Sequence, residues 1–265
     1  MGLNLTRTVW RIGTDGRTEA AEEWLAAESP WTLRVNGQEL VTLIASPADL
    51  EDLAIGYLAN EGLITRADQV SILVVDDEEG QIWVRVPGLR LAPEMLGRRL
   101  LTSCCGRGRP SLYFLNDASL RPVTERGAVL SPSAVMALVA ALDAAAPAFH
   151  QSGGLHSAAL TAGTALLAVR SDVGRHNALD KLAGWRLRQE TPAGEAIVFS
   201  GRISSEVVVK VARMDLAIIL SNAAPTSLGC ELAEDLGITT VGFVRQGRLN
   251  IYTHPHRIQT ARRSV

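Results

Sequence analysis

Short strand-like and helix-like segments alternate regularly through the second half of the chain, from Ser157 to Tyr252. Runs of β-branched and other apolar residues predict strands at residues 157–161, 165–170, 196–200, 216–220, 239–244 and 249–252. Helical periodicity predicts helices at residues 175–188, 204–213 and 226–236. Segments that alternate in this way pack as helices against a sheet, with ligand groups at the strand-to-helix turns.

The first half of the chain is richer in predicted strands. Two β-rich runs, 31–35 and 39–44, flank Asn36-Gly37, which is typical of a tight hairpin turn. Two further strands are predicted at 70–75 and 81–86, around an acidic turn.

Serine-proline pairs mark the starts of two helices, because serine caps a helix and proline suits its first position. Ser46-Pro47 predicts a helix that runs to Gly62, and Ser131-Pro132 predicts an alanine-rich one. The expected fold is therefore α/β with two domains. Residues 1–130 form an α+β, strand-rich part with one helix, and residues 131–265 form a layered α/β domain.

Composition narrows the functional classes. The chain has 265 residues, 47% of them hydrophobic, and a formal net charge of −2. A general nucleic-acid or membrane-surface binder normally carries a clear basic excess, so neither partner is expected. Met1–Ala20 holds no apolar run like that of a signal peptide, and no segment is long and apolar enough to span a bilayer. With three cysteines, two of them adjacent, the chain is no disulfide framework, and we expect a cytoplasmic protein.

The segment from Pro87 to Pro110 breaks the pattern and predicts a long, basic, mobile loop. It holds five arginines and two cysteines, namely Arg90, Arg98, Arg99, Arg107, Arg109, Cys104 and Cys105. Arginines favour the thiolate, which is the reactive form of cysteine. The alternative is a pair of idle surface thiols, which their liability to oxidation disfavours. Cys230, in a predicted helix, is interpreted as a packing residue.

The densest polar run is Ser171–Lys181, where a predicted strand turns into a helix. A helix start offers unpaired N–H groups and partial positive charge, which suit an anion such as phosphate. We therefore predict a ligand site here, against the alternative of an ion pair across a solvated helix. Ser200–Arg202 and Asn222–Thr226 occupy equivalent turns.

Zinc is the rival explanation for Cys104, Cys105 and His156. Zinc sites commonly use a Cys-x-x-Cys pair, which this chain lacks, and adjacent cysteines chelate poorly. We therefore expect no metal. His156 follows Gly153-Gly154 and is as compatible with a structural hydrogen bond as with a site. Glu206 is interpreted as a charge at a helix start.

Six motifs, in order, closely resemble the FdhD family of formate dehydrogenase accessory proteins. They are residues 46–64 (SPADLEDLAIGYLANEGLI), 153–160 (GGLHSAAL), 172–181 (DVGRHNALDK), 200–206 (SGRISSE), 222–228 (NAAPTSL) and 241–255 (VGFVRQGRLNIYTHP). The resemblance extends from about Trp31 to Ile258.

The resemblance implies a sulfur carrier of the sulfurtransferase type. Such proteins take sulfur from a cysteine desulfurase as a cysteine persulfide and pass it to molybdenum, or tungsten, bis(molybdopterin guanine dinucleotide) for formate dehydrogenase. It also implies a homodimer, binding of guanine nucleotide, with guanosine diphosphate (GDP) as a mimic of the cofactor ends, and a C-terminal domain like cytidine deaminases without their zinc ligands.

Residue by residue, the resemblance assigns the persulfide to Cys104. The family's loop usually reads Ser-Cys-Gly-x-Cys-Gly, so its second cysteine falls on Arg107 and its first glycine on Cys105. The cofactor-binding residues are then predicted as Phe243, Val244, Arg245, Gln246, Gly247, Arg248, His156, Arg175, His176, Arg202 and Asn222.

Two alternatives stay open at this stage. A cofactor-binding chaperone that relays no sulfur fits the altered cysteine loop. A zinc-dependent deaminase fits less well, because Ala158 stands where a catalytic glutamate would follow His156.

Overall fold

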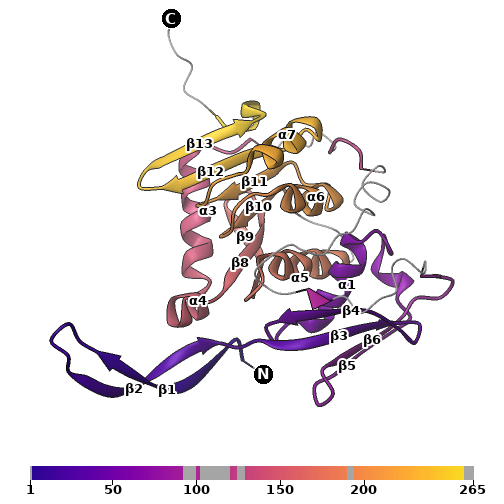
Figure 1. The fold of residues 1–265 in the computed structure, drawn as a ribbon. Helices are drawn as coiled ribbons and strands as arrows, with labels where there is room; N and C mark the ends of the chain where they lie inside the picture. Colours follow the sequence, from indigo (N-terminus) through magenta and orange to yellow (C-terminus); the bar gives the residue numbers. More distant parts are fainter. Residues whose placement is uncertain (1, 92–99, 102–119, 124–128, 190–193, 260–265) are drawn as a thin grey trace, which may run out of the picture.

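The computed structural model describes residues 2–91, 100–101, 120–123, 129–189 and 194–259. Figure 1 shows two sheets, one above the other in that view, with α1 and α5 side by side between them. A two-stranded hairpin extends away from this body.

The lower sheet has five strands in the order β5-β6-β3-β4-β7. The elements of this half are β1 (Asn4–Ile12), β2 (Thr18–Ala26), β3 (Ser29–Val35), β4 (Gln38–Ala45), α1 (Leu50–Asn60), η1 (Ala67–Gln69), β5 (Ile72–Asp76), β6 (Gln81–Arg85) and β7 (Leu100–Leu101). The predicted turn at Asn36-Gly37 is confirmed, with both residues at positive φ. The Asn36 side chain also bonds both backbone groups of Val86, which ties β6 to the turn.

The predicted start of the first helix is wrong. Helix α1 begins at Leu50, and Ser46 does not cap it. Ser46 instead lies buried at the end of β4, where its Oγ accepts from the Val173 N–H at 3.1 Å. Its N–H donates to Asp172 and its carbonyl accepts from Lys181. Long-range bonds from the second half therefore replace the local cap that the sequence pattern indicates.

The upper sheet has six strands in the order β13-β12-β11-β10-β8-β9. Its half comprises α3 (Pro132–Ala144), α4 (Pro147–Ser152), β8 (His156–Ala162), β9 (Ala165–Asp172), α5 (Arg175–Leu187), β10 (Ala196–Phe199), α6 (Ser205–Arg213), β11 (Ile218–Ser221), α7 (Ser227–Asp235), β12 (Thr239–Arg245), β13 (Arg248–Thr253) and η3 (Pro255–Arg257). Every residue of β10 and β11 is buried, as expected for parallel strands covered on both faces. Helix α3 crosses the strands on one side, while α5, α6 and α7 lie in a row on the other (Figure 1).

The predicted α/β alternation of the second half is confirmed element by element. Ser131 caps α3 by accepting from the Ala134 N–H, as its pattern predicts. The sequence analysis missed α4 and the β1–β2 hairpin.

Helices α1 and α5 join the two halves through a close crossing. A Cβ at Gly56 would overlap the backbone of Asp180, and a Cβ at Gly184 would overlap the backbone of Asp52. The absence of a side chain at both positions lets the backbones approach this closely. Beside the crossing, Asp52 accepts from Arg170 at 2.7 Å and from Arg188 at 2.9 Å.

Each half has its own hydrophobic cluster, residues 31–86 in the first and 123–258 in the second. A boundary at residue 130 stays a proposal. No helix in the described ranges is long and apolar enough to cross a membrane.

Candidate functional site

One edge of the upper sheet gathers most of the predicted site residues. Strands β10, β11 and β12 are parallel, so their carboxyl ends meet at this edge. Strand β8 is antiparallel to β10 and places its first residue, His156, at the same edge. The end of β9 faces His156, because Asp172 is its partner in register, so α5 begins here too. This common edge is the usual position for ligand groups in a sheet with parallel strands.

The turns at this edge contact one another directly. His156 Nδ1 lies 3.4 Å from Ser200 Oγ. Ser221 Oγ donates to the Gly201 carbonyl at 2.8 Å, which joins the turn after β10 to the end of β11. The Phe243 N–H donates to the Ala223 carbonyl at 3.1 Å, which joins the turn after β11 to the end of β12. These contacts join the start of β8, the turns that follow β10 and β11, and the end of β12 into one continuous surface, which we call the edge site.

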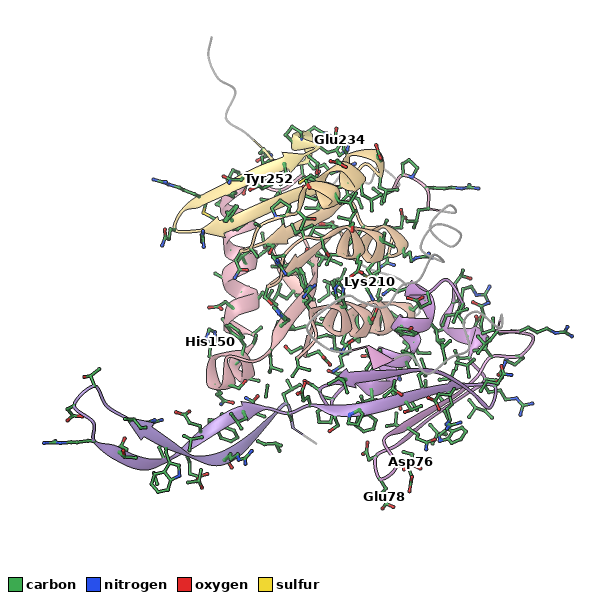
Figure 2. All side chains as sticks on the ribbon, in the orientation of Figure 1. Asp76, Glu78, His150, Lys210, Glu234 and Tyr252 are labelled. Carbon is green, nitrogen blue, oxygen red and sulfur yellow. The ribbon has the colours of Figure 1, made fainter. Side chains whose placement is uncertain are left out.

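The polar run at 171–181 serves mainly to hold the structure, and the site prediction for it is correct only in part. Lys181 and Asp172 form an ion pair of 2.6 Å with no exposed surface on either side chain. Asp180 pairs with Lys210, which Figure 2 shows between α6 and α5, and accepts from Asn60 of α1. The alternative of an ion pair on a solvated helix is wrong, since these pairs are buried.

Arg175 and His176 are the members of that run left at the edge site. Arg175 begins α5, and its Nε is buried without a hydrogen-bond partner. Ser204, the residue before α6, has a buried Oγ with no partner either. Buried polar atoms without partners are rare in proteins and call for an explanation. Two such donors at the starts of two helices match an anionic ligand.

His176 Nε2 lies 3.0 Å from Glu206 Oε2, so the starts of α5 and α6 are joined by an ion pair when the histidine is protonated. The sequence interpretation gave Glu206 only a local role at a helix start. A histidine and a glutamate 30 positions apart carry no local signal of pairing. Ser200 lies in a turn that the sequence analysis named, but neither Ser200 nor Ser204 was predicted as a site residue.

Burial, and then the nearby Arg175 guanidinium, lower the pKa of His156 below its ordinary value. The imidazole is therefore neutral at pH 7. A neutral ring leaves Arg175 as the positive group beside it, and a bound anion would offset the effect of Arg175 on the ring.

The remaining predicted residues divide by exposure. Arg202, Asn222 and the turn at 245–248 are exposed. Val244 is buried in the hydrophobic cluster, so a ligand could contact only its backbone. Phe243 adopts a left-handed conformation with φ of 51°, which is uncommon without glycine. The Arg245 guanidinium lies 5.0 Å from its ring centre.

Cys104, Cys105 and the arginines from Arg98 to Arg109 lie outside the described residues. Within the predicted Pro87–Pro110 loop, Leu100–Leu101 form β7 beside β4, and the loop prediction for the residues outside the described ranges stays a prediction. Cys230 is half-buried on α7, less than the buried packing residue that the sequence predicts, and burial raises the pKa of its thiol. Within the ranges that the structure covers, no three histidine, cysteine, aspartate or glutamate side chains converge.

Comparison with known proteins identifies the family. The profile of the FdhD/NarQ family matches residues 26–259. This chain belongs to the FdhD/NarQ family. Curated FdhD relatives include the sulfur carrier protein FdhD of Bacillus licheniformis, 41% identical over 98% of this chain and 99% of the relative. The sulfur carrier protein FdhD of Staphylococcus aureus strain MRSA252 is 41% identical over 92% of each chain.

A solved structure supports the FdhD fold. It comes from Desulfotalea psychrophila and is described as a formate dehydrogenase accessory protein. It superimposes with a TM-score of 0.82 at 26% identity, over 97% of this chain and 100% of that one. The resemblance to cytidine deaminases is not tested by these matches and stays a prediction.

Proposed function

We propose that this chain is a sulfur carrier that serves the maturation of a formate dehydrogenase. Support comes from its FdhD relatives, two of which are named sulfur carrier proteins and align with almost the whole chain. The related protein of known structure is described as a formate dehydrogenase accessory protein.

The proposed sulfur relay uses Cys104. Its thiolate attacks the outer sulfur of a cysteine persulfide on a cysteine desulfurase. A new S–S bond forms on Cys104, the S–S bond of the donor breaks, and the donor cysteine leaves as a thiolate. The sulfur passes between two thiolates at the same oxidation level, so this step consumes no external oxidant.

The proposed recipient is molybdenum, or tungsten, bis(molybdopterin guanine dinucleotide), bound as a substrate through its nucleotide ends. The single observation that carries this proposal is the pair of buried, unpartnered groups at the edge site, Arg175 Nε and Ser204 Oγ. An arginine fork binds phosphate oxygens bidentately, and the helix starts supply further N–H groups. Arg202, Asn222 and the turn at 243–248 would contact the nucleotide from the exposed side.

GDP binding tests the edge site. Removing a charge-assisted hydrogen bond costs about 1.5–3 kcal/mol, so Arg175→Ala should weaken the Kd for GDP about tenfold or more in calorimetry. Arg66→Ala is the matched control, because Arg66 is exposed and pairs with Asp68 in η1. Equal GDP affinity in the native chain and Arg175→Ala would remove Arg175 from the site.

Sulfur loading tests the relay separately. After incubation with a cysteine desulfurase and cysteine, peptide mapping should find an addition of about 32 Da, one sulfur atom, on Cys104, whose thiolate is the reactive form. If sulfur loading persisted in Cys104→Ala and disappeared in Cys105→Ala, the assignment of the persulfide to Cys104 would be wrong.

Arg107, in place of the family's usual second cysteine, favours one alternative. A chaperone that binds the cofactor without relaying sulfur would bind GDP but load sulfur on neither cysteine. We also propose that the protein acts in the cytoplasm and as a homodimer.

A further inference from the structure

The Ser200 hydroxyl is held beside the His156 ring by the backbone of β8. His156 Nδ1 lies 3.4 Å from Ser200 Oγ, and the same oxygen accepts from the Ser157 N–H at 2.9 Å. The Ser157 carbonyl in turn accepts from the Ser200 N–H at 3.0 Å. These two bonds to Ser157 fix the hydroxyl at the start of β8, independently of the charge on the ring.

A serine hydroxyl is both a donor and an acceptor. Ser200 can donate its hydrogen to Nδ1 of a neutral His156 ring and can accept from the Nδ1–H of a protonated ring. A partly buried ring without such a partner would lose a hydrogen bond in one of its two charge states, which carries a desolvation cost. The contact with Ser200 therefore lets His156 gain or lose a proton without turning.

Arg175 lies against the same turn from the side of α5. A Cβ added at Gly201 would lie 3.5 Å from the Arg175 Cβ, so the turn after β10 contacts both His156 and the start of α5. After burial, the Arg175 guanidinium is the larger charge effect that lowers the pKa of His156, and Asp172 raises it by less. Asp172 is also matched by Lys181 at 2.6 Å. The positive charge of Arg175 therefore prevails at the ring.

The other charged groups at the edge site do not change this balance. Arg202 is exposed, so water and salt screen its charge. Glu206 lies 3.0 Å from the ring of His176, to which its charge is directed. In the protein without ligand, His156 is therefore a neutral ring beside Arg175, whose buried Nε has no hydrogen-bond partner.

A bound diphosphate would reverse the balance at His156. Its oxygens would pair with Arg175 and bring negative charge to the same place. An opposite charge within about 4–6 Å favours the charged form of a titratable group, so the ring would become a second cationic donor to the anion. Because such coupling is reciprocal, the proton and the anion would each strengthen the binding of the other.

We propose that His156 takes up a proton when a diphosphate binds at the edge site, and that Ser200 is the positioning residue that keeps the ring in place in both charge states. This inference rests on the nucleotide binding proposed above and names the residues that make this binding depend on pH.

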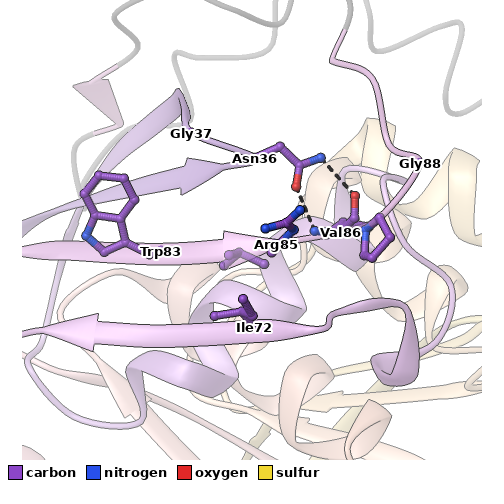
Figure 3. A pocket seen from close by; sticks show the side chains of 9 residues that line it. Asn36, Gly37, Ile72, Trp83, Arg85, Val86 and Gly88 are labelled. Carbon is purple, nitrogen blue, oxygen red and sulfur yellow. Dashed lines mark hydrogen bonds between the residues drawn. The ribbon is translucent and has the colours of Figure 1, made fainter.

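Another cavity with an arginine at its wall lies in the first half of the chain. It has a volume of about 450 Å³ and adjoins the Asn36-Gly37 turn, and Figure 3 shows Arg85 at its wall. Among the described residues that line it there is no histidine, aspartate or glutamate. GDP bound there would therefore contact no lining side chain that titrates near neutral pH, so proton uptake distinguishes the two cavities.

Calorimetry of GDP binding in buffers of different ionisation enthalpy measures the protons taken up per GDP. The terminal phosphate of GDP itself titrates near about pH 6, so the native chain is compared with His156→Gln at each pH, which cancels this contribution. Glutamine keeps an N–H donor but does not titrate. The native chain should take up more protons than the variant, by up to about one per GDP, and its advantage in Kd should grow up to about tenfold per unit as pH falls from about 7.5 to 5.5. Arg85→Ala is the control and should match the native chain throughout.

Ser200→Ala tests the positioning role. The protonated ring loses the acceptor for its Nδ1–H, so the Kd for GDP at about pH 6 should rise about two- to tenfold. An NMR titration of the GDP complex should also give a lower pKa for His156 than in the native chain. Ser200→Thr keeps the hydroxyl and should restore both values. Ser157→Ala is the matched control, because its Oγ contacts Ser171 Oγ at 2.7 Å and not the ring, and circular dichroism would verify that each variant is folded.

The outcomes separate this inference from the proposed function. Equal proton uptake by the native chain and His156→Gln would refute the inference, while GDP binding that still depends on Arg175 would keep the nucleotide site. Native values in Ser200→Ala, or no recovery in Ser200→Thr, would refute the positioning role and so the inference as stated. Loss of GDP binding in Arg85→Ala, or no GDP binding by the native chain, would refute both. Sulfur loading on Cys104 would test the relay independently.

Discussion

Replacement of Lys181 by methionine should destabilise the protein more than most single substitutions. The side chain exposes no surface, and its Nζ lies 2.6 Å from Asp172 Oδ2. Methionine fills a similar volume, so the main effect is an unpaired carboxylate in the core. Breaking a buried pair in this way costs about 3–5 kcal/mol. For a chain of this size that loss lowers Tm by roughly 6–20 °C.

Urea unfolding followed by circular dichroism, with a thermal scan, measures the effect. Asp172→Asn combined with Lys181→Met removes both charges and should lie closer to the native stability than Lys181→Met alone, because an asparagine leaves no buried charge. A loss below about 1 kcal/mol in Lys181→Met would refute the argument, since it would mean that water reaches the carboxylate.

Three further predictions follow from the fold and the site. Because the pKa of His156 is lower in the folded protein, the unfolded chain binds a proton at this residue first as pH falls. The stabilising contribution of His156 is therefore complete above about pH 6.5 and is lost as pH falls through the folded pKa. His156→Gln should flatten the decline in Tm measured between pH 8 and 5, and a decline equal to that of the native chain would contradict this. Gly184→Ala should force α1 and α5 apart and cost at least about 1–3 kcal/mol in urea unfolding, whereas Gly247→Ala, with nothing within 4 Å of its added Cβ, meets only backbone strain. Ser131→Ala should lower the free energy of unfolding by about 1 kcal/mol through loss of the α3 cap, and an unchanged urea midpoint would show that the cap does not stabilise the protein.

The order of strands and helices in the second half follows from the sequence, because its buried strands and amphipathic helices carry clear periodicity. The position of the edge site could be predicted for the same reason, because its turns lie at the ends of strands that meet at one edge of the sheet. The β1–β2 hairpin could not be predicted in this way. Its strands mix threonine, glutamate and arginine with apolar residues in no strict alternation, and most of their side chains are exposed.

The buried ion pairs are the second feature that could not be predicted from the sequence. The sequence analysis placed Asp180 and Lys181 in a predicted ligand site, with a solvated ion pair as the alternative, and predicted no buried pair, because charged side chains are rarely buried without a partner. Their partners lie 30 positions ahead at Lys210 and nine behind at Asp172, and Ser46 and Asn60 come from the other half of the chain. No local pattern announces such distant pairing.

The position of Ser46 has a consequence for how this protein could be recombined with its relatives. Through its N–H, carbonyl and hydroxyl, this one residue of the first half holds Asp172, Lys181 and Val173, which set the start of α5 and hence Arg175. The two halves are therefore not interchangeable modules, even though each has its own sheet and core. A chimaera that joined the first half of one relative to the second half of another would have to carry this three-point junction intact. Where the junction did not match, the conformation of the turn before α5 would be lost along with the contact between the halves, although no residue of that turn had changed.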